Sequence, residues 1–322
     1  MPLTDEQILD QFHHATAGPF LRTEAGRGLL RMRGNDARDL LHRLSSARID
    51  NLGDGELRET LLTTEKGRVI DALLVTVEEG GLRLLTSPGR TPDVHAWLEK
   101  FTIMEDCTYE DASATVRQVS VFNLPDDPST IPFGFELPPA GKAATVSIDG
   151  HAVDLLRHDS VSGPGLRLLV VAEDSDAVLR YMEDSAGLSV ISDEAFALWR
   201  IERLLPAMGA EMGEHSNPLE AGAGQAVDFR KGCFIGQEVI ARLDSYDKVQ
   251  RHPCRLRFSG PGSDAVAHGA VLSADGAVAG LVTTVAFHPG EKAMLGIGLV
   301  RNAHTAPGTR LRCGEAEVEV IG

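Results

Sequence analysis

The stretch that decides the fold runs from Lys231 to Glu238 and has the sequence KGCFIGQE. Gly232 and Gly236 lie on either side of Cys233–Ile235, and a helix is predicted directly afterwards over Gln237–Leu243. A glycine-containing turn that leads into a helix presents free N–H groups and positive potential. Arg230 precedes the segment, and such surroundings favour a reactive thiolate at Cys233. The alternative is that Cys233 is a small buried apolar residue, which is the usual environment of a free cysteine.

The same segment belongs to a basic island in an acidic chain. Residues 230–257 hold seven basic and three acidic residues, a local balance of +4, whereas the whole chain has a formal net charge of −16. The island is a candidate site for a small polyanion, and the alternative is a solvated surface beside a β-domain. The acidic chain as a whole is repelled by phosphate backbones and anionic membranes, so neither nucleic acid nor a membrane is a predicted partner.

The cysteines indicate free thiols. Neither a Cys-x-x-Cys pair nor spacing typical of a zinc site or a disulfide framework occurs among Cys107, Cys233, Cys254 and Cys313. Free thiols fit a reducing compartment, and the first twelve residues lack the apolar core of a signal peptide. We therefore expect a cytoplasmic protein without a bound metal.

The first part of the chain predicts an α+β unit with an antiparallel sheet. The predicted strands are Gly28–Arg33, Leu57–Thr63, Arg68–Val77, Leu82–Thr86 and a strand near Cys107. Helices are predicted over Ala37–Leu44, capped by Asn35 or Asp36, and over Pro92–Phe101.

The remainder predicts a second such unit followed by a change of character near Val249. Its predicted strands are Thr115–Phe122, Ala144–Ile148, Ala152–Arg157 and Leu166–Val171, and its predicted helices are Ser175–Ala186 and Asp193–Leu205. A Gly- and Pro-rich stretch over 206–224 is typical of backbone that lines a site. Short strands after residue 249 predict a small β-barrel or sandwich. The predicted domains are 1–248, with halves 24–112 and 113–248, and 249–322.

Two carboxylates stand out by their surroundings. Asp71 interrupts an apolar strand, so it either points to solvent or faces a polar cavity, and the pattern alone favours solvent. Glu202, on the helix before the Gly- and Pro-rich stretch, can accept paired N–H groups from a heterocycle. It can equally be a surface residue that pairs with a neighbouring arginine.

The segment KGCFIGQE, followed by Ala241-Arg242, resembles the signature of the YgfZ-type folate-binding proteins, which are relatives of the glycine-cleavage T-protein, an aminomethyltransferase. The resemblance extends over most of the chain. The other matching segments are Gly34–Ala37 with Leu40–His42, Arg200–Glu202, Asn217–Gly222 and Gly280–Thr284.

The resemblance implies an α+β fold with two ferredoxin-like domains and a small carboxy-terminal β-barrel, arranged as a three-domain ring around a folate channel. It implies that Glu202 grips the pterin ring, where a carboxylate suits the ring's amino and N–H donors. The basic island would then suit the folate's glutamate carboxylates. The residues that the resemblance places at the cofactor are Glu202, Arg200, Asn217, Glu220, Lys231, Gln237 and Arg242.

The resemblance also nominates two catalytic residues, Cys233 and Asp71. The enzymatic relatives carry two adjacent aspartates where this chain has Asp71-Ala72, so one carboxylate of the pair remains. Their aspartate acts near N5 of the folate, whereas T-protein relatives generally lack the cysteine-containing octapeptide. This combination favours the YgfZ type.

Three functions follow as hypotheses. The first is a tetrahydrofolate-binding accessory protein for assembly or repair of iron–sulfur cluster enzymes, with Cys233 as its key thiol and iron–sulfur assembly proteins or client enzymes as partners. The second is a folate-dependent aminomethyltransferase or demethylase that uses Asp71 and a one-carbon-substituted tetrahydrofolate. The third is a folate-sensing module that does no chemistry.

Overall fold

A computed structural model describes residues 2–125, 127–161 and 163–322. Contacts within the chain group these residues into two compact units. The first unit combines the amino-terminal helix with Ile191–Gly224 and Glu238–Gly322, and the second combines Gly18–Val190 with Gln225–Gln237. We describe each unit by itself.

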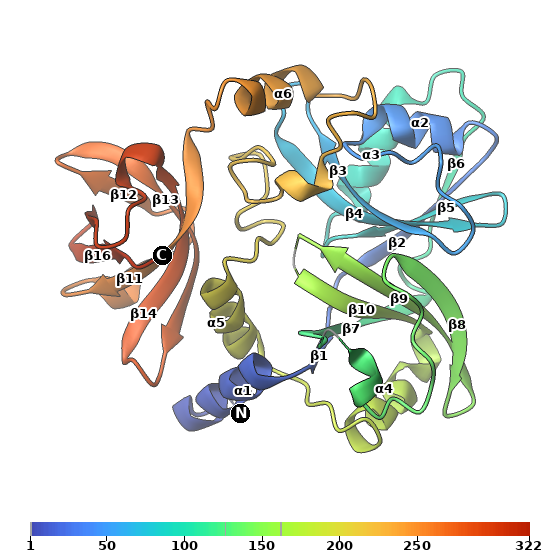
Figure 1. The fold of residues 1–322 in the computed structure, drawn as a ribbon, viewed down its shortest axis with the longest axis horizontal. Helices are drawn as coiled ribbons and strands as arrows, with labels where there is room; N and C mark the ends of the chain where they lie inside the picture. Colours follow the sequence, from blue (N-terminus) through green and yellow to red (C-terminus); the bar gives the residue numbers. More distant parts are fainter. Residues whose placement is uncertain (1, 126, 162) are drawn as a thin grey trace. The chain divides into compact units, whose positions relative to one another are not determined.

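The first sheet of the second unit has the strand order β3-β4-β5-β2-β6, with antiparallel neighbours throughout (Figure 1). One face of this sheet is covered by helices α2 (Ala37–Leu44) and α3 (Thr91–Phe101), which share a hydrophobic core with it. The strands are β2 (Gly28–Arg33), β3 (Leu57–Thr63), β4 (Val69–Glu78), β5 (Gly81–Thr86) and β6 (Thr108–Asp111).

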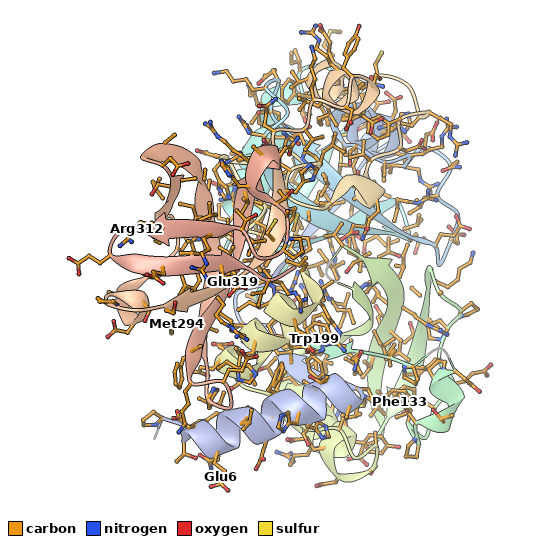
Figure 2. The ribbon with its side chains drawn as sticks, turned by 60° about the vertical axis from the view of Figure 1, so that its left-hand side comes forward. Glu6, Phe133, Trp199, Met294, Arg312 and Glu319 are labelled. Carbon is orange, nitrogen blue, oxygen red and sulfur yellow. The ribbon has the colours of Figure 1, made fainter. Side chains whose placement is uncertain are left out.

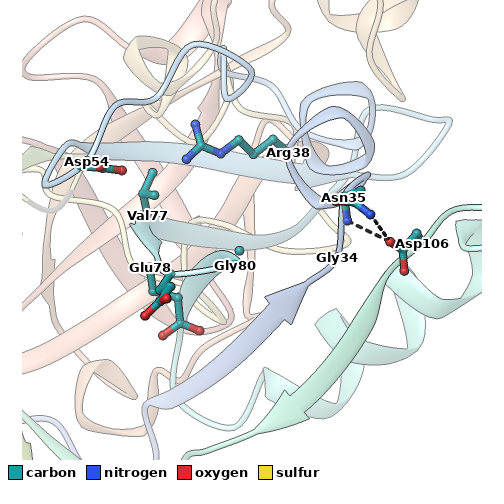
Figure 3. Close-up of a pocket in the computed structure, with 10 residues that line it drawn as sticks. Gly34, Asn35, Arg38, Asp54, Val77, Glu78, Gly80 and Asp106 are labelled. Carbon is teal, nitrogen blue, oxygen red and sulfur yellow. Dashed lines mark hydrogen bonds between the residues drawn. The ribbon is translucent and has the colours of Figure 1, made fainter.

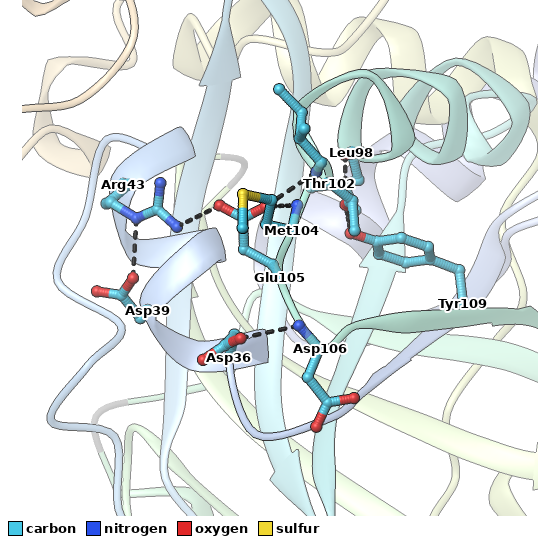
Figure 4. A network of polar contacts seen from close by, with 10 residues as sticks. Asp36, Asp39, Arg43, Leu98, Thr102, Met104, Glu105, Asp106 and Tyr109 are labelled. Atoms are coloured by element: carbon cyan, nitrogen blue, oxygen red, sulfur yellow. Dashed lines mark hydrogen bonds and ion pairs between the residues drawn. The ribbon is translucent and has the colours of Figure 1, made fainter.

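Polar contacts fix the start of α2 and the turn between α3 and β6 (Figure 4). Glu105 accepts the backbone N–H groups of Ile103 and Met104 at 2.9 and 3.1 Å and the Arg43 guanidinium at 2.9 Å. Asp36 stands at the cap position of α2, as predicted, but its side chain makes no capping hydrogen bond. Its carboxylate instead accepts the N–H of Asp106 at 2.8 Å, so it ties the helix start to the turn before β6.

The second sheet of this unit has the order β1-β7-β10-β9-β8. Helix α4 (Ser175–Asp184) packs on one face through Val178 and Met182. The opposite face meets the first sheet through a buried cluster that includes Leu156, Leu169 and Leu74. Both sheets are therefore covered on two sides. The strands are β1 (Phe20–Thr23), β7 (Val116–Phe122), β8 (Lys142–Ile148), β9 (His151–Ser160) and β10 (Gly163–Val171).

The first unit holds α1 (Asp5–Ala17), α5 (Asp193–Arg203), α6 (Gln237–Ser245), whose first residue falls in the other unit, and a closed barrel. Figure 2 shows Glu6 on α1, Trp199 on α5, and Met294, Arg312 and Glu319 on the barrel strands. The barrel order is β11-β14-β13-β12-β15-β16. Its strands are β11 (Arg251–Ser259), β12 (Val271–Ala274), β13 (Ala277–His288), β14 (Ala293–Arg301), β15 (Arg310–Cys313) and β16 (Ala316–Val320).

The predicted fold class, α+β with two sheet-and-helix halves and a carboxy-terminal β-barrel, is confirmed. The short strand β1 was not predicted, and the predicted helix over Ser175–Ala186 ends earlier, at Asp184. The predicted domain limits stay a prediction. No helix in the described part of the chain is long and apolar enough to cross a membrane.

Candidate functional site

The KGCFIGQE segment is seated on the first sheet of the second unit. Just before it, the Ser46 hydroxyl donates to the Ala226 carbonyl at 2.6 Å, and the Asp228 N–H donates to the Ser46 carbonyl at 3.0 Å. Within it, the hydroxyl of Thr63 on β3 donates to the Ile235 carbonyl at 2.5 Å. The Ile235 side chain packs against the core between the sheet and its helices. The backbone on both sides of Cys233 is therefore held in place.

Lys231 anchors the same segment from inside. Its side chain is buried, and its ammonium group donates to the backbone carbonyls of His42 and Ser45 at the end of α2. Desolvation by burial lowers the pKa of Lys231 to about 8. Lys231 therefore has a structural role in this segment, because its ammonium group donates to carbonyl oxygens of the protein itself.

Cys233 is exposed, whereas Cys254 and Cys313 are buried. The alternative that Cys233 is a small buried apolar residue is therefore wrong. Helix α6 begins at Gln237, four residues after the cysteine, which agrees with the predicted helix start. The segment presents a thiol at the surface of a fixed loop.

Gly236 explains why this loop requires glycine. Its φ of +85° lies in the left-handed region, and a Cβ built there would lie 2.6 Å from the Thr64 carbonyl oxygen. A side chain would therefore clash with backbone as well as strain the conformation. The glycine allows the loop to approach the β3–β4 turn closely.

Asp71 lies on β4 and is fully buried, so the prediction that it points to solvent is wrong. Its carboxylate accepts the N–H of Ser87 at 3.1 Å and the N–H of Ala72 at 2.9 Å. Desolvation by burial raises the pKa of Asp71 to about 6, because the hydrogen bonds and the distant Arg27 charge only partly offset it. The group is thus poised to exchange a proton near neutral pH.

Asp71 and the octapeptide are both held next to strand β3. Asp71 pairs with Leu62 on β3, and the next β3 residue, Thr63, bonds the Ile235 carbonyl. A bulge between Leu62 and Thr63 separates the two contacts. Asp71 and the loop that carries Cys233 therefore both contact strand β3.

In the first unit, Arg200 and a residue that the sequence did not nominate form a buried ion pair. The Glu211 carboxylate accepts the Arg200 guanidinium and the Ala207 N–H, the latter at 3.0 Å. Its other oxygen accepts the hydroxyls of Thr283 and Thr284 on β13 at 2.7 and 2.6 Å. This network joins α5, the 206–224 stretch and the barrel. Arg200 therefore helps to join these three parts of the first unit.

Asn217 and Glu220 also have internal partners. The Asn217 side chain accepts the N–H groups of Leu219 and Glu220 at 3.0 Å each. The Glu220 carboxylate pairs through both oxygens with Arg251 on β11, at 3.2 and 2.8 Å. Glu211 was not nominated from the sequence, and Arg251 was counted only as part of the basic island, because the pairing of each depends on the irregular path of residues 206–224.

Glu202 is different, because its side chain is 43% exposed at the end of α5. It lies 3.5 Å from the Arg203 guanidinium and 3.5 Å from the Thr16 hydroxyl of α1. The arginine neighbour agrees with the alternative of a surface ion pair, whereas the contact between Glu202 and a pterin ring stays a prediction.

The basic island separates into individual pairs. Arg242 pairs with Glu238 at 3.0 Å along α6, Arg251 pairs with Glu220, and Arg257 pairs with Glu291. Arg230 and Lys231 belong to the second unit, and the other basic residues of the island belong to the first. Several charges in the local balance of +4 are therefore already paired with carboxylates of the protein.

A cavity of about 620 Å³ lies where α2 begins, next to the β4–β5 turn (Figure 3). Arg38, Asp54 and Glu78 line it, and Asn35 contacts Asp106 at its edge with an amide-to-carboxylate distance of 2.7 Å. None of the predicted site residues lines this cavity. Within the described ranges, no cluster of three or more His, Cys, Asp or Glu side chains is arranged to hold a metal ion.

No protein-family model matches the chain. An aminomethyltransferase of Symbiobacterium thermophilum is 27% identical and is matched over 100% of this chain and 87% of its own length. A putative chloroplastic transferase of Arabidopsis thaliana is 24% identical, over 97% of this chain and 71% of its own. The crystal structure of the glycine cleavage system aminomethyltransferase T from Bartonella henselae superposes with a TM-score of 0.79, at 18% identity, over 98% of this chain and 88% of that one.

The chain has the fold of an aminomethyltransferase T-protein. Asp71 lies on strand β4 of the amino-terminal sheet, and Cys233 lies on a loop that is bonded to strand β3 of the same sheet. Glu202 and the Glu211 network lie in the unit that contains the barrel.

Proposed function

We propose that this protein binds tetrahydrofolate and acts as an accessory factor for assembly or repair of iron–sulfur cluster enzymes, with Cys233 as its working thiol. The observation that carries the proposal is the exposure of Cys233 on a loop fixed at Lys231, Ile235 and Gly236. A thiol that only filled space would be buried, as Cys254 and Cys313 are.

The folate part of the proposal rests on the T-protein fold and on the resemblance of the octapeptide to folate-binding relatives. Glu202 is the proposed pterin ligand, since its carboxylate is accessible. Gln237 and Arg242, at the start and on the exposed side of α6, complete the proposed binding set. Arg200, Asn217, Glu220 and Lys231 act as positioning residues, because each is bonded to the protein itself.

Glu202→Ala should weaken tetrahydrofolate binding roughly ten- to a hundredfold, the cost of losing charge-assisted hydrogen bonds to a heterocycle. Calorimetric titration of tetrahydrofolate into the full chain measures this change. Glu194→Ala, which removes an exposed carboxylate from the first turn of the same helix, is the matched control and should bind as the wild type does. Equal affinity in both variants would remove Glu202 as the pterin anchor.

Cys233→Ala should leave the protein folded but unable to restore iron–sulfur enzyme activities in a strain that lacks the gene. Because the Cys233 side chain is exposed and fills no space in the core, a folding defect would not explain a loss of rescue. Cys313→Ala, at a buried position in the barrel, serves as the control allele and should rescue. Full rescue by the Cys233→Ala allele would rule out the thiol role.

A second candidate function is one-carbon transfer to or from tetrahydrofolate, and Asp71 is the observation that favours it. A buried carboxyl with a pKa of about 6 can take and return a proton beside a reacting nitrogen. Wild type should then form methylene-tetrahydrofolate from an aminomethyl donor. The rate of this reaction should be at least about a hundredfold lower in Asp71→Asn. Absence of turnover in the wild type with every aminomethyl donor would contradict this function while leaving folate binding intact.

A further inference from the structure

The turn between α3 and β6 carries the two most exposed large apolar side chains in the described part of the chain. Ile103 is 84% exposed and Met104 is 93% exposed, just after the end of α3. The apolar side chains Val94 and Leu98 of α3 itself are buried. Large apolar side chains that lie together at the surface mark contact sites for other molecules, and methionine is enriched in protein interfaces.

This turn is fixed, so its apolar side chains stand on a rigid backbone. Glu105 accepts the N–H groups of both apolar residues and the Arg43 guanidinium of α2, all within 3.1 Å (Figure 4). These hydrogen bonds, of which that from Arg43 is the strongest influence, lower the pKa of Glu105 to about 2, so the carboxylate stays ionised. Asp36 at the start of α2 accepts the N–H of Asp106 at 2.8 Å. A turn that is fixed before binding loses little conformational entropy when a partner covers it.

The surface next to the turn carries accessible carboxylates. Asp106, on the turn itself, also lines the cavity of about 620 Å³ where α2 begins (Figure 3). Asp54 and Glu79 line the same cavity, and all three of these residues are exposed. The cavity therefore offers negative charge to a cation beside the apolar turn.

The basic residues near this cavity already have partners within the protein. Arg38, which lines the cavity, donates to the Leu52 carbonyl at 2.6 Å. Arg31 and Arg33 lie 3.6 and 3.7 Å from the carboxylate of Glu78, the other acidic residue that lines the cavity. The charge left on the accessible surface is therefore negative.

This charge selects among the possible occupants of the surface. A second copy of this chain would bring the same acidic residues face to face, and an anionic membrane or a nucleic acid would be repelled. A protein with lysine or arginine side chains around an apolar pocket complements both features, the apolar turn and the acidic cavity.

We propose that the turn between α3 and β6 is a docking point for a partner protein. An apolar pocket of the partner receives Ile103 and Met104, and lysine or arginine side chains beside that pocket face Asp106, Asp54 and Glu79. The proposal uses neither folate nor the predicted catalytic residues. It therefore holds or fails independently of the proposed function.

Photo-crosslinking in living cells identifies the partner. A benzophenone amino acid replaces Met104 in the full chain, and the same amino acid in place of Glu183, an exposed residue of α4, is the control. Mass spectrometry then names the protein that is crosslinked from position 104 but not from position 183. We expect one such protein, with basic residues next to the crosslinked segment.

The identified protein is then purified, and its affinity for the full chain is measured by biolayer interferometry. Met104→Asp should weaken binding by about tenfold or more, because it removes an apolar anchor from the contact. Val278→Asp, which changes an exposed apolar residue in the other unit, is the matched control and should bind as the wild type does. Glu79→Lys should weaken binding and reduce its dependence on salt, because it removes an attraction to basic side chains.

Circular dichroism checks that these variants are folded. The proposal is overturned if position 104 crosslinks no protein, or only a second copy of this chain. It is also overturned if the partner binds Met104→Asp as tightly as wild type, or if added salt does not weaken binding to wild type.

Discussion

Glu211→Gln should destabilise the protein by about 3 kcal/mol or more, the cost of leaving a buried charge without its partner. The substitution keeps the size of the side chain and an oxygen for Thr283 and Thr284, but it removes the charge that faces Arg200. Both members of the pair are buried, so water cannot replace the lost partner. Urea unfolding followed by circular dichroism measures the change.

A double-mutant cycle separates the pair from its surroundings. Arg200→Met alone should also be destabilising, whereas the combination with Glu211→Gln should recover much of the loss, because no buried charge then remains unpaired. Losses that simply add would show that the ion pair is not the source of the stability. A change below about 0.5 kcal/mol in Glu211→Gln would contradict the prediction outright.

The network around Arg200 and Glu211 also shows why part of the site could not be predicted from the sequence. Strands such as β2 and β3 are defined by local patterns, and their predicted bounds agree with the structure. The pairs Arg200–Glu211 and Glu220–Arg251 join residues whose proximity depends on the irregular path of residues 206–224. No local period encodes such a path. The Gly- and Pro-rich composition predicted a site-like segment, but not its partners.

Asp71 illustrates a different limit. An isolated carboxylate in a strand is normally expected on the solvent-exposed face of its sheet, and this expectation assumes that one face is exposed. Strand β4 has no such face here: its Leu73 packs into the core with α2 and α3, and its Leu74 packs into the cluster between the two sheets. The two-sided burial follows from how the sheets stack. It therefore became visible only in three dimensions.

Glu59→Gln should change the pH dependence of stability, because Glu59 on β3 shares the polar region between the two sheets with Arg27 and Arg167. Desolvation by burial raises the pKa of Glu59 to about 7, while the Val161 N–H, at 2.9 Å from the carboxylate, and the two arginines only partly oppose this. The folded protein therefore holds this proton more tightly than the unfolded chain does. Its contribution to stability is complete below the unfolded pKa and is lost as the pH rises through about 7.

Glutamine keeps an oxygen for the Val161 N–H but cannot ionise. The difference in the free energy of unfolding between the variant and wild type should therefore rise by about 2 kcal/mol, in favour of the variant, from roughly pH 5 to pH 8. The raised pKa of Asp71 acts in both proteins and cancels in the comparison. Glu183→Gln, at an exposed position on α4, should show no such gain. Parallel stability profiles for wild type and Glu59→Gln across this range would mean that Glu59 is already ionised in the folded protein, with the arginines outweighing its burial.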